Sequence, residues 1–171
     1  MLFVSNGFTN SHNPSMGGGQ RETRWLTPRE IVEPLGVFDL DPAGAPGHRL
    51  ATLTFMPENG LDGLEETWAG RVWLNPPYGK ELVPFMAKMA EHDYGTALVF
   101  ARTETEWFRN YVWGAATALL FLTSRLHFLH PDGTPAKHNA GAPSVLVAYG
   151  REDAQMLAES GLDGFYVRIR E

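Results

Sequence analysis

Asn75, Pro76, Pro77 and Tyr78 are the residues best suited to chemistry, and they directly follow the strand-like run at 71–74. An amino group conjugated to a ring or a carbonyl is a poor nucleophile, because its lone pair is delocalised. The Asn75 side-chain oxygen and the Pro76 carbonyl can both accept hydrogen bonds from such a group and turn its lone pair toward an electrophilic methyl group. The tetrapeptide therefore predicts a site that activates an amine for methylation by orientation and electrostatics.

The neighbouring residue types suit the same task. Pro77, like Pro76, fixes φ and removes a donor, so the carbonyls can be held pointing into the site. Tyr78 offers a flat face on which a planar ring can stack, and Gly79 lets the backbone turn without strain. An ordinary turn with two prolines and a surface tyrosine is the structural alternative.

An alternation of strands and helices must position this turn. Strands are predicted at 37–41, 71–75, 95–100, 117–122, 145–149 and 165–169, and helices at 28–35, 80–92, 104–113 and 152–160. We expect the helix at 104–113 to be opened by Thr103, and residues 42–60 to be irregular. The pattern predicts an α/β fold with a mostly parallel sheet and helices on both faces, in which ligands bind at the carboxyl ends of the strands.

Length and composition limit the remaining choices. The chain has 171 residues, of which 43% are hydrophobic, which is enough for one sizeable core. Residues 1–20 are rich in Ser, Asn and Gly and predict a flexible arm, and residues 21–171 predict a single domain. The absence of cysteine excludes disulfides and thiolate metal sites and favours a cytoplasmic location. We expect no signal peptide and no membrane span.

The charge balance argues against a protein that coats nucleic acid without specificity. The net charge is −6, from 14 basic and 20 acidic residues. Such a chain can still bind nucleic acid if its few phosphate contacts cluster on a local basic face.

Asp41 and Pro42 end the predicted strand at 37–41, so they and Asn75 can face one crevice at the carboxyl ends of strands. Asp39 and Asp41 alternate along that strand, which means that only one of them readily faces the crevice. We favour Asp41.

The order of these segments resembles that of the S-adenosylmethionine-dependent amino-methyltransferases, and within them the small phage-type DNA N6-adenine methyltransferases. The resemblance covers residues 25–150 and rests on the segments at 25–28, 38–43, 62–64, 75–79, 101–107 and 124–128. It implies a Rossmann-like methyltransferase fold. Two features depart from the family pattern, because the loop after the first strand lacks the usual Gly-x-Gly spacing and the chain has no room for a separate target-recognition domain.

The resemblance implies a set of S-adenosylmethionine-binding residues: Trp25, Thr27, Asp41, Pro42, Asp62 and Asn75. Thr27 and its neighbours would meet the amino-acid end of the cofactor, and Asp62 would accept a hydrogen bond from its adenine. Trp25 also suits the core, and Asp62 also suits a solvated turn. Glu58 is a further candidate for the ribose hydroxyls, although no motif fixes its position.

The implied DNA contacts are Tyr78, Arg102, Arg125, Lys137 and His138. Arg102 and Arg125 follow predicted strands, where they can meet phosphate or pair with a nearby acid. His127 and His130 add to the basic stretch around Lys137 and His138. Their spacing is not that of a zinc site, so we predict a DNA-facing loop and no metal.

The resemblance implies methyl transfer from S-adenosylmethionine to the N6 amino group of adenine in DNA. The target adenine would be flipped out of the duplex, and transfer would be direct. The same motif serves cytosine N4 and the glutamine side-chain amide, but glutamine methyltransferases usually carry an extra helical N-terminal domain. A non-catalytic DNA-binding module is the alternative from another class. A phage or prophage origin in a bacterial host, with protection of DNA from restriction, is a further expectation.

Overall fold

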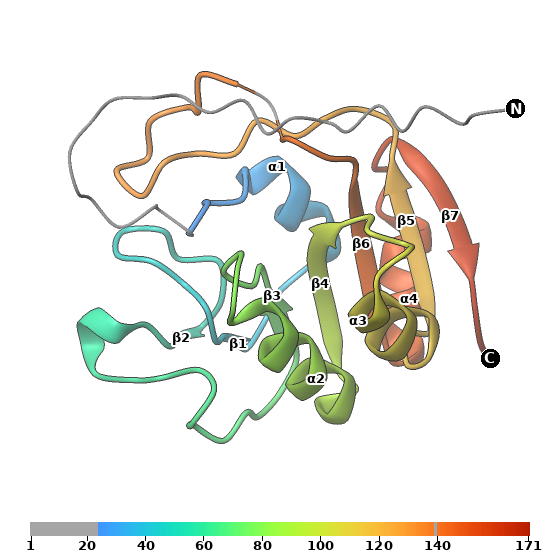
Figure 1. The fold of residues 1–171 in the computed structure, drawn as a ribbon, viewed down its shortest axis with the longest axis horizontal. Helices are drawn as coiled ribbons and strands as arrows, with labels where there is room; N and C mark the ends of the chain where they lie inside the picture. The colour runs from blue at the N-terminus through green and yellow to red at the C-terminus, as the bar shows by residue number, and fades with distance from the viewer. Residues whose placement is uncertain (1–23, 139) are drawn as a thin grey trace, which may run out of the picture.

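The computed structural model describes residues 24–138 and 140–171, so the arm predicted at 1–20 lies outside the described residues. One seven-stranded sheet runs through the described part of the chain, in the order β2-β1-β3-β4-β6-β5-β7 (Figure 1). Its strands are β1 (Leu40–Asp41), β2 (Leu53–Thr54), β3 (Val72–Leu74), β4 (Gly95–Phe100), β5 (Ala118–Leu122), β6 (Ser144–Tyr149) and β7 (Gly164–Arg168).

The two halves of the sheet are paired differently. Strands β2, β1, β3 and β4 pair in parallel, whereas β4 with β6, β6 with β5, and β5 with β7 pair antiparallel. Strands β1 to β5 therefore share one direction, and β6 and β7 run against them. The prediction of a mostly parallel sheet is confirmed for the direction of the strands but not for their pairing. The sequence of a buried apolar strand such as β6 does not indicate whether it runs parallel or antiparallel to its neighbours.

Helices cover both faces of the sheet, as predicted. One face carries α2 (Leu82–His92), α3 (Glu106–Phe108) and the π-helical turn η3 (Arg109–Trp113). The other carries α1 (Arg29–Val32), the 3₁₀ turn η1 (Glu33–Leu35) and α4 (Arg151–Glu159). Figure 1 shows α2 and α3 in front of the sheet and α4 behind it.

Strand β3 directs the site residue that follows it. Val72 and Leu74 pack in the core under α2, and Trp73 packs in the opposite core, with its ring 5.6 Å from that of Phe38. Because side chains alternate between the faces of a strand, Asn75 continues on the face of Trp73. The alternation along β3 thus directs the Asn75 side chain toward the face of the sheet that α1 covers.

A buried ion pair anchors the beginning of β3. Arg71 Nη2 lies 2.8 Å from Asp153 Oδ1 of α4, and Arg71 Nη1 donates to the carbonyl of Leu35 at 2.7 Å. Burial raises the pKa of Asp153, and its bonds to Arg71 and Thr96 act against that rise. The guanidinium therefore ties β3 to the helices of the second face.

Two local predictions were wrong. Residues 42–60 contain β2 and the 3₁₀ turn η2 (Pro57–Asn59), and β2 is too short to leave a periodic signal. Thr105, not Thr103, caps α3, with its Oγ1 accepting from the N–H of Phe108 at 3.4 Å. A turn places Thr105 there, since its N–H donates to the Arg102 carbonyl at 3.0 Å.

Candidate active site

Asn75 lies just beyond β3 with its amide orientation fixed. Its Nδ2 donates to the Trp25 carbonyl at 2.5 Å and to Thr27 Oγ1 at 3.1 Å. A carbonyl can only accept, so the amide nitrogen must face Trp25. The Asn75 Oδ1 is buried and receives no hydrogen bond from the residues that the structure describes. Because a buried acceptor without a donor is unfavourable, this oxygen is suited to receive an N–H from a ligand.

Tyr78 presents one ring face and one hydroxyl to the site. Its ring stacks on Phe100 at 4.6 Å between centroids and 20° between planes, so only the other face is open to a ligand. The hydroxyl is buried without a partner among the described residues, and burial raises the pKa of Tyr78. The phenol therefore stays protonated and can donate. Sequence reasoning missed Phe100, although its place as the last residue of β4, beside β3, was a usable signal.

In the turn after Asn75, Gly79 has the backbone conformation that calls for a glycine. Pro76 and Pro77 are buried, and Gly79 adopts a φ of 115°. That positive φ strains any residue with a side chain, which explains the glycine.

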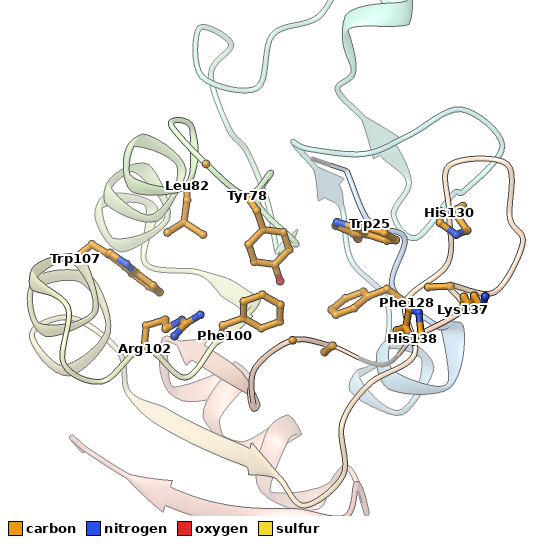
Figure 2. Close-up of a pocket in the computed structure, with 14 residues that line it drawn as sticks. Trp25, Tyr78, Leu82, Phe100, Arg102, Trp107, Phe128, His130, Lys137 and His138 are labelled. Carbon is orange, nitrogen blue, oxygen red and sulfur yellow. The ribbon is translucent and has the colours of Figure 1, made fainter. Parts of the chain in front are cut away.

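A broad cavity of about 670 Å³ opens on one side of this turn (Figure 2). Its walls are mainly aromatic, with basic groups among them: Trp25, Tyr78, Phe100, Trp107, Phe128, Arg102, His130, Lys137 and His138. Four of the five predicted DNA contacts therefore line one space. Arg125 does not, because it is exposed and its Nη1 donates to the Ala140 carbonyl at 2.9 Å.

A narrow cavity of about 20 Å³ lies on the other side of Asn75. It gathers four of the predicted cofactor residues, namely Trp25, Thr27, Asp41 and Asn75, together with residues that sequence reasoning missed, Gly44 and His48 among them. Its volume suits about one water molecule. Trp25 lines both cavities and so stands at their boundary.

Asp41 is the acidic group of the narrow cavity, which Arg24 and His48 also line. Its side chain is 4% exposed, and its Oδ1 accepts from the N–H of Ala43 at 3.1 Å. Burial raises the pKa of Asp41 to about 7, against the lowering effect of that hydrogen bond. Asp39 is exposed and accepts from the Arg71 N–H at 2.7 Å. The alternation along β1 thus places Asp41 at the site and Asp39 outside it.

His48 braces the segment that holds Asn75. Its Nε2 lies 2.9 Å from the Thr27 carbonyl, so this nitrogen carries the ring proton. Burial lowers the pKa of His48, and the bond to Thr27 acts against that effect. A neutral imidazole therefore supports Thr27 from the far side of the narrow cavity.

Asp62 and Pro42 are brought close to this region without lining either of the two cavities. Asp62 is exposed, and its Oδ1 accepts from the N–H of Leu64 at 2.9 Å. Gly63 packs against the chain at Pro42, where an added Cβ would lie 1.8 Å from the Pro42 carbonyl oxygen. The segments at 62–64 and 41–43 therefore touch, although the Asp62 carboxylate caps its own turn.

One residue that lines the narrow cavity forms an ion pair with a residue outside its lining. Arg24 lines that cavity, and its Nη1 lies 2.7 Å from Glu58 Oε1. The bond to Arg24 lowers the pKa of Glu58. Glu58, the candidate for the ribose hydroxyls, thus pairs with Arg24 and does not itself line the cavity.

The part of the chain that the structure describes contains no cluster of three His, Asp or Glu side chains that could hold a metal ion. None of the helices in residues 24–138 and 140–171 is long and apolar enough to cross a membrane.

The mixed sheet, with an Asn-Pro-Pro-Tyr turn at the carboxyl end of β3, is consistent with an α/β fold of the methyltransferase type. Residues 17–159 match the family described as DNA N-6-adenine-methyltransferase (Dam). The match covers most of the chain, so the protein belongs to the DNA N6-adenine methyltransferase (Dam) family, and the resemblance found in the sequence is confirmed. Comparisons with curated proteins and with solved structures found no significant match.

Proposed function

We propose that this protein transfers a methyl group from S-adenosylmethionine to the N6 amino group of adenine in DNA. The observation that carries the proposal is the locked amide of Asn75, whose nitrogen is bound by Trp25 and Thr27 and whose buried Oδ1 is left to accept. Family membership supports adenine in DNA as the acceptor.

The residues of the narrow cavity fit the cofactor in chemistry. S-adenosylmethionine carries an ammonium and a sulfonium, and Asp41 offers a buried carboxyl whose raised pKa reports a charge that lacks a cation. Trp25, Thr27 and Asp41 would hold the amino-acid end. The cavity of about 20 Å³ must widen for this, and the ion pair between Arg24, which lines it, and Glu58 is a candidate place for that opening.

When bound, S-adenosylmethionine supplies a methyl group whose carbon–sulfur bond breaks as the acceptor nitrogen bonds to carbon and then loses its proton to water. The protein's own part is to hold the acceptor. Asn75 Oδ1 and the Pro76 carbonyl accept from the amino group, which localises the nitrogen lone pair. No residue of the chain needs to form a covalent intermediate.

The adenine would reach these acceptors from the broad cavity. An adenine inside a duplex cannot present its amino group to a buried acceptor, so the base must be flipped out. The open face of Tyr78 would take the ring, with Phe100 backing the other face. Arg102, Lys137 and His138 line the same cavity and would contact the phosphates.

The test is transfer of labelled methyl from S-adenosylmethionine to unmethylated DNA, followed by digestion to nucleosides. We expect label in N6-methyladenine. Label in N4-methylcytosine would identify cytosine as the acceptor. Label only in glutamine of an added protein substrate would identify a protein, and not DNA, as the substrate.

A non-catalytic module is the second candidate, because the narrow cavity as it stands is far smaller than the cofactor. Calorimetric titration with S-adenosylmethionine discriminates the two. Binding together with transfer supports the enzyme, whereas absence of both supports a module that only holds DNA. A phage or prophage origin, with methylation that protects DNA from restriction, stays a prediction.

A further inference from the structure

The broad cavity is larger than one flipped base requires. A cavity of about 150 Å³ accommodates benzene, so a purine of two fused rings needs roughly 250 Å³. The cavity measures about 670 Å³. Space for a second planar group remains after the target adenine is placed.

The stacked rings of Tyr78 and Phe100 stand between two parts of this cavity (Figure 2). On one side lie Trp25 and Phe128, and Trp25 also borders the narrow cavity beside Asn75. The target adenine belongs on this side, since its amino group must reach Asn75. The part of the cavity on the opposite side has no role in holding the target base.

That opposite part is built from Leu82 of α2, Trp107 of α3 and Arg102, which lies between β4 and α3 (Figure 2). The Trp107 indole is partly exposed, and its edge contact with Phe108, at 5.4 Å and 62°, helps to hold its plane. The Arg102 guanidinium is exposed and forms no hydrogen bond or ion pair with the residues that the structure describes. A flat aromatic face beside an available guanidinium and an apolar wall suits a nucleotide, whose base stacks and whose phosphate pairs with the cation.

We propose that Trp107 and Arg102 bind the nucleotide next to the target adenine, with the neighbouring base stacked on Trp107 and its phosphate at Arg102. This rests on the proposed function, because it places the target adenine on the Asn75 side of the cavity. The consequence concerns the substrate class. Two adjacent bases leave the helical stack together, so the protein acts best on single-stranded or locally melted DNA, where unstacking is least unfavourable.

The chain offers matched controls for both residues. Trp113 lies in η3 and contacts the same Phe108 ring at 5.5 Å and 65°, yet it does not line the cavity. Arg109 is exposed in the same helical segment and is also outside the cavity lining. Loss of the Trp113 side chain removes a contact with the same Phe108 ring, and loss of Arg109 removes the same charge as loss of Arg102, in both cases without touching the proposed subsite.

The experiment combines protein variants with abasic oligonucleotides. The dissociation constant of a fluorescently labelled single-stranded 9-mer with one central adenine is measured for wild type, Trp107→Leu and Trp113→Leu. Oligonucleotides that lack the base on the 5′ or the 3′ side of the adenine are measured in parallel. We expect removal of the base on one side to weaken wild type and Trp113→Leu about tenfold. The same removal leaves Trp107→Leu unchanged, because the stacking partner is already gone.

Equal losses in wild type and Trp107→Leu, or no loss from either abasic site, would overturn the subsite. Arg102→Gln provides a second measurement at an exposed position where folding is not at issue. It should lower the slope of log affinity against log salt by about one, whereas Arg109→Gln should not. An unchanged slope in Arg102→Gln removes the phosphate contact from the proposal.

These readouts are binding constants, so they separate the subsite from the proposed activity. If no methyl is transferred to any DNA but the abasic effect depends on Trp107, the proposed function fails and the nucleotide site stands. If N6-methyladenine forms but the abasic effect is absent, the function stands and the subsite fails. A wild-type preference for duplex over single-stranded acceptor in kcat/KM would also contradict the substrate class inferred here.

Discussion

The two cavities that share Trp25 differ greatly in size. The broad cavity, proposed to take the acceptor, measures about 670 Å³ between aromatic walls, whereas the narrow cavity, proposed to take the cofactor, measures about 20 Å³ and is lined by Arg24 of the Arg24–Glu58 pair. On the proposed function, the acceptor side has room for its ligand as it stands, and the cofactor side must open. The difference means that the two substrates are to be tested separately, the acceptor through the aromatic walls and the cofactor through the charged groups of the narrow cavity.

The largest expected effect comes from Asn75, which borders the narrow cavity. Asn75→Ala removes the buried Oδ1 acceptor and should lower kcat on the order of 10²–10³-fold, as loss of one oriented polar group does elsewhere. Affinity for S-adenosylmethionine should change little, because Trp25, Thr27 and Asp41 remain. Single-turnover transfer and calorimetry measure the two quantities. Turnover near that of wild type would mean that this oxygen does not hold the acceptor.

A smaller effect is expected at Tyr78, on the acceptor side alone. Tyr78→Ala removes the stacking face and should lower kcat/KM for DNA about 10–100-fold. Tyr78→Phe keeps the stacking face and loses only the hydroxyl that has no partner among the described residues. Its kcat/KM for DNA should therefore fall only a few fold. Steady-state kinetics with an oligonucleotide compares them. An equal loss of kcat/KM in both variants would mean that Tyr78 acts through its hydroxyl and not through its ring.

The cofactor side should respond to pH through Asp41. The Asp41 pKa of about 7 means that the carboxyl is mostly protonated at pH 6 and mostly ionised at pH 7.5. A cationic ligand favours the ionised form, so affinity for S-adenosylmethionine should be on the order of tenfold weaker at pH 6. Arg24 and His48 line the same cavity, and the neutral His48 adds little charge change there. Calorimetry at the two pH values measures the difference.

Asp41→Asn is the control, and it should bind the cofactor weakly at both pH values. The pH dependence of the stability of this variant gives an independent test. The Asp41 pKa is raised on folding, so its carboxyl stabilises the folded state below about pH 4, and that contribution is lost as pH rises to about 7. The variant should therefore unfold at higher denaturant than wild type at pH 7.5 but not at pH 4. A wild-type affinity independent of pH would place the cofactor cation away from Asp41.

The same contrast explains how much the sequence could predict. The strands β4, β5 and β6 and the helix α2 were predicted from local periodicity, and the structure confirms them. Alternation along β1 also placed Asp41 correctly. Phe100 was missed because its stack on Tyr78 joins β4 to the turn after β3 through tertiary packing, and only its place at the end of β4, beside β3, hinted at that contact.

The closure of the cofactor side was equally inaccessible from local pattern. Glu58 lies in η2, and its partner Arg24 lies more than thirty residues earlier, so no spacing rule connects them. The segment at 62–64 was foreseen as a motif, but its turn, with Asp62 bonded to the Leu64 N–H, depends on the contact of Gly63 with Pro42. The sequence thus predicted which residue types gather, and tertiary contacts decide which of them face the cavity.

The smallest expected effect concerns the ion pair between Arg24 and Glu58. Arg24→Gln removes the ion pair between Arg24, which lines the narrow cavity, and Glu58. A pair of this partly exposed kind contributes about 0.2–1 kcal/mol, so affinity for S-adenosylmethionine should tighten by about two- to fivefold. Stopped-flow binding should assign most of that gain to faster association, because the closed state becomes less favoured.

Glu58→Gln breaks the same pair from the other side and decides what Glu58 does. If Glu58 serves only to hold Arg24, the two variants tighten cofactor binding alike. If Glu58 also accepts from the ribose hydroxyls once Arg24 has moved, Glu58→Gln weakens binding while Arg24→Gln strengthens it. Opposite changes in cofactor affinity would indicate that Glu58 exchanges its ion pair with Arg24 for hydrogen bonds to the ribose hydroxyls of the cofactor. No change in either variant would show that the narrow cavity widens somewhere other than at this ion pair.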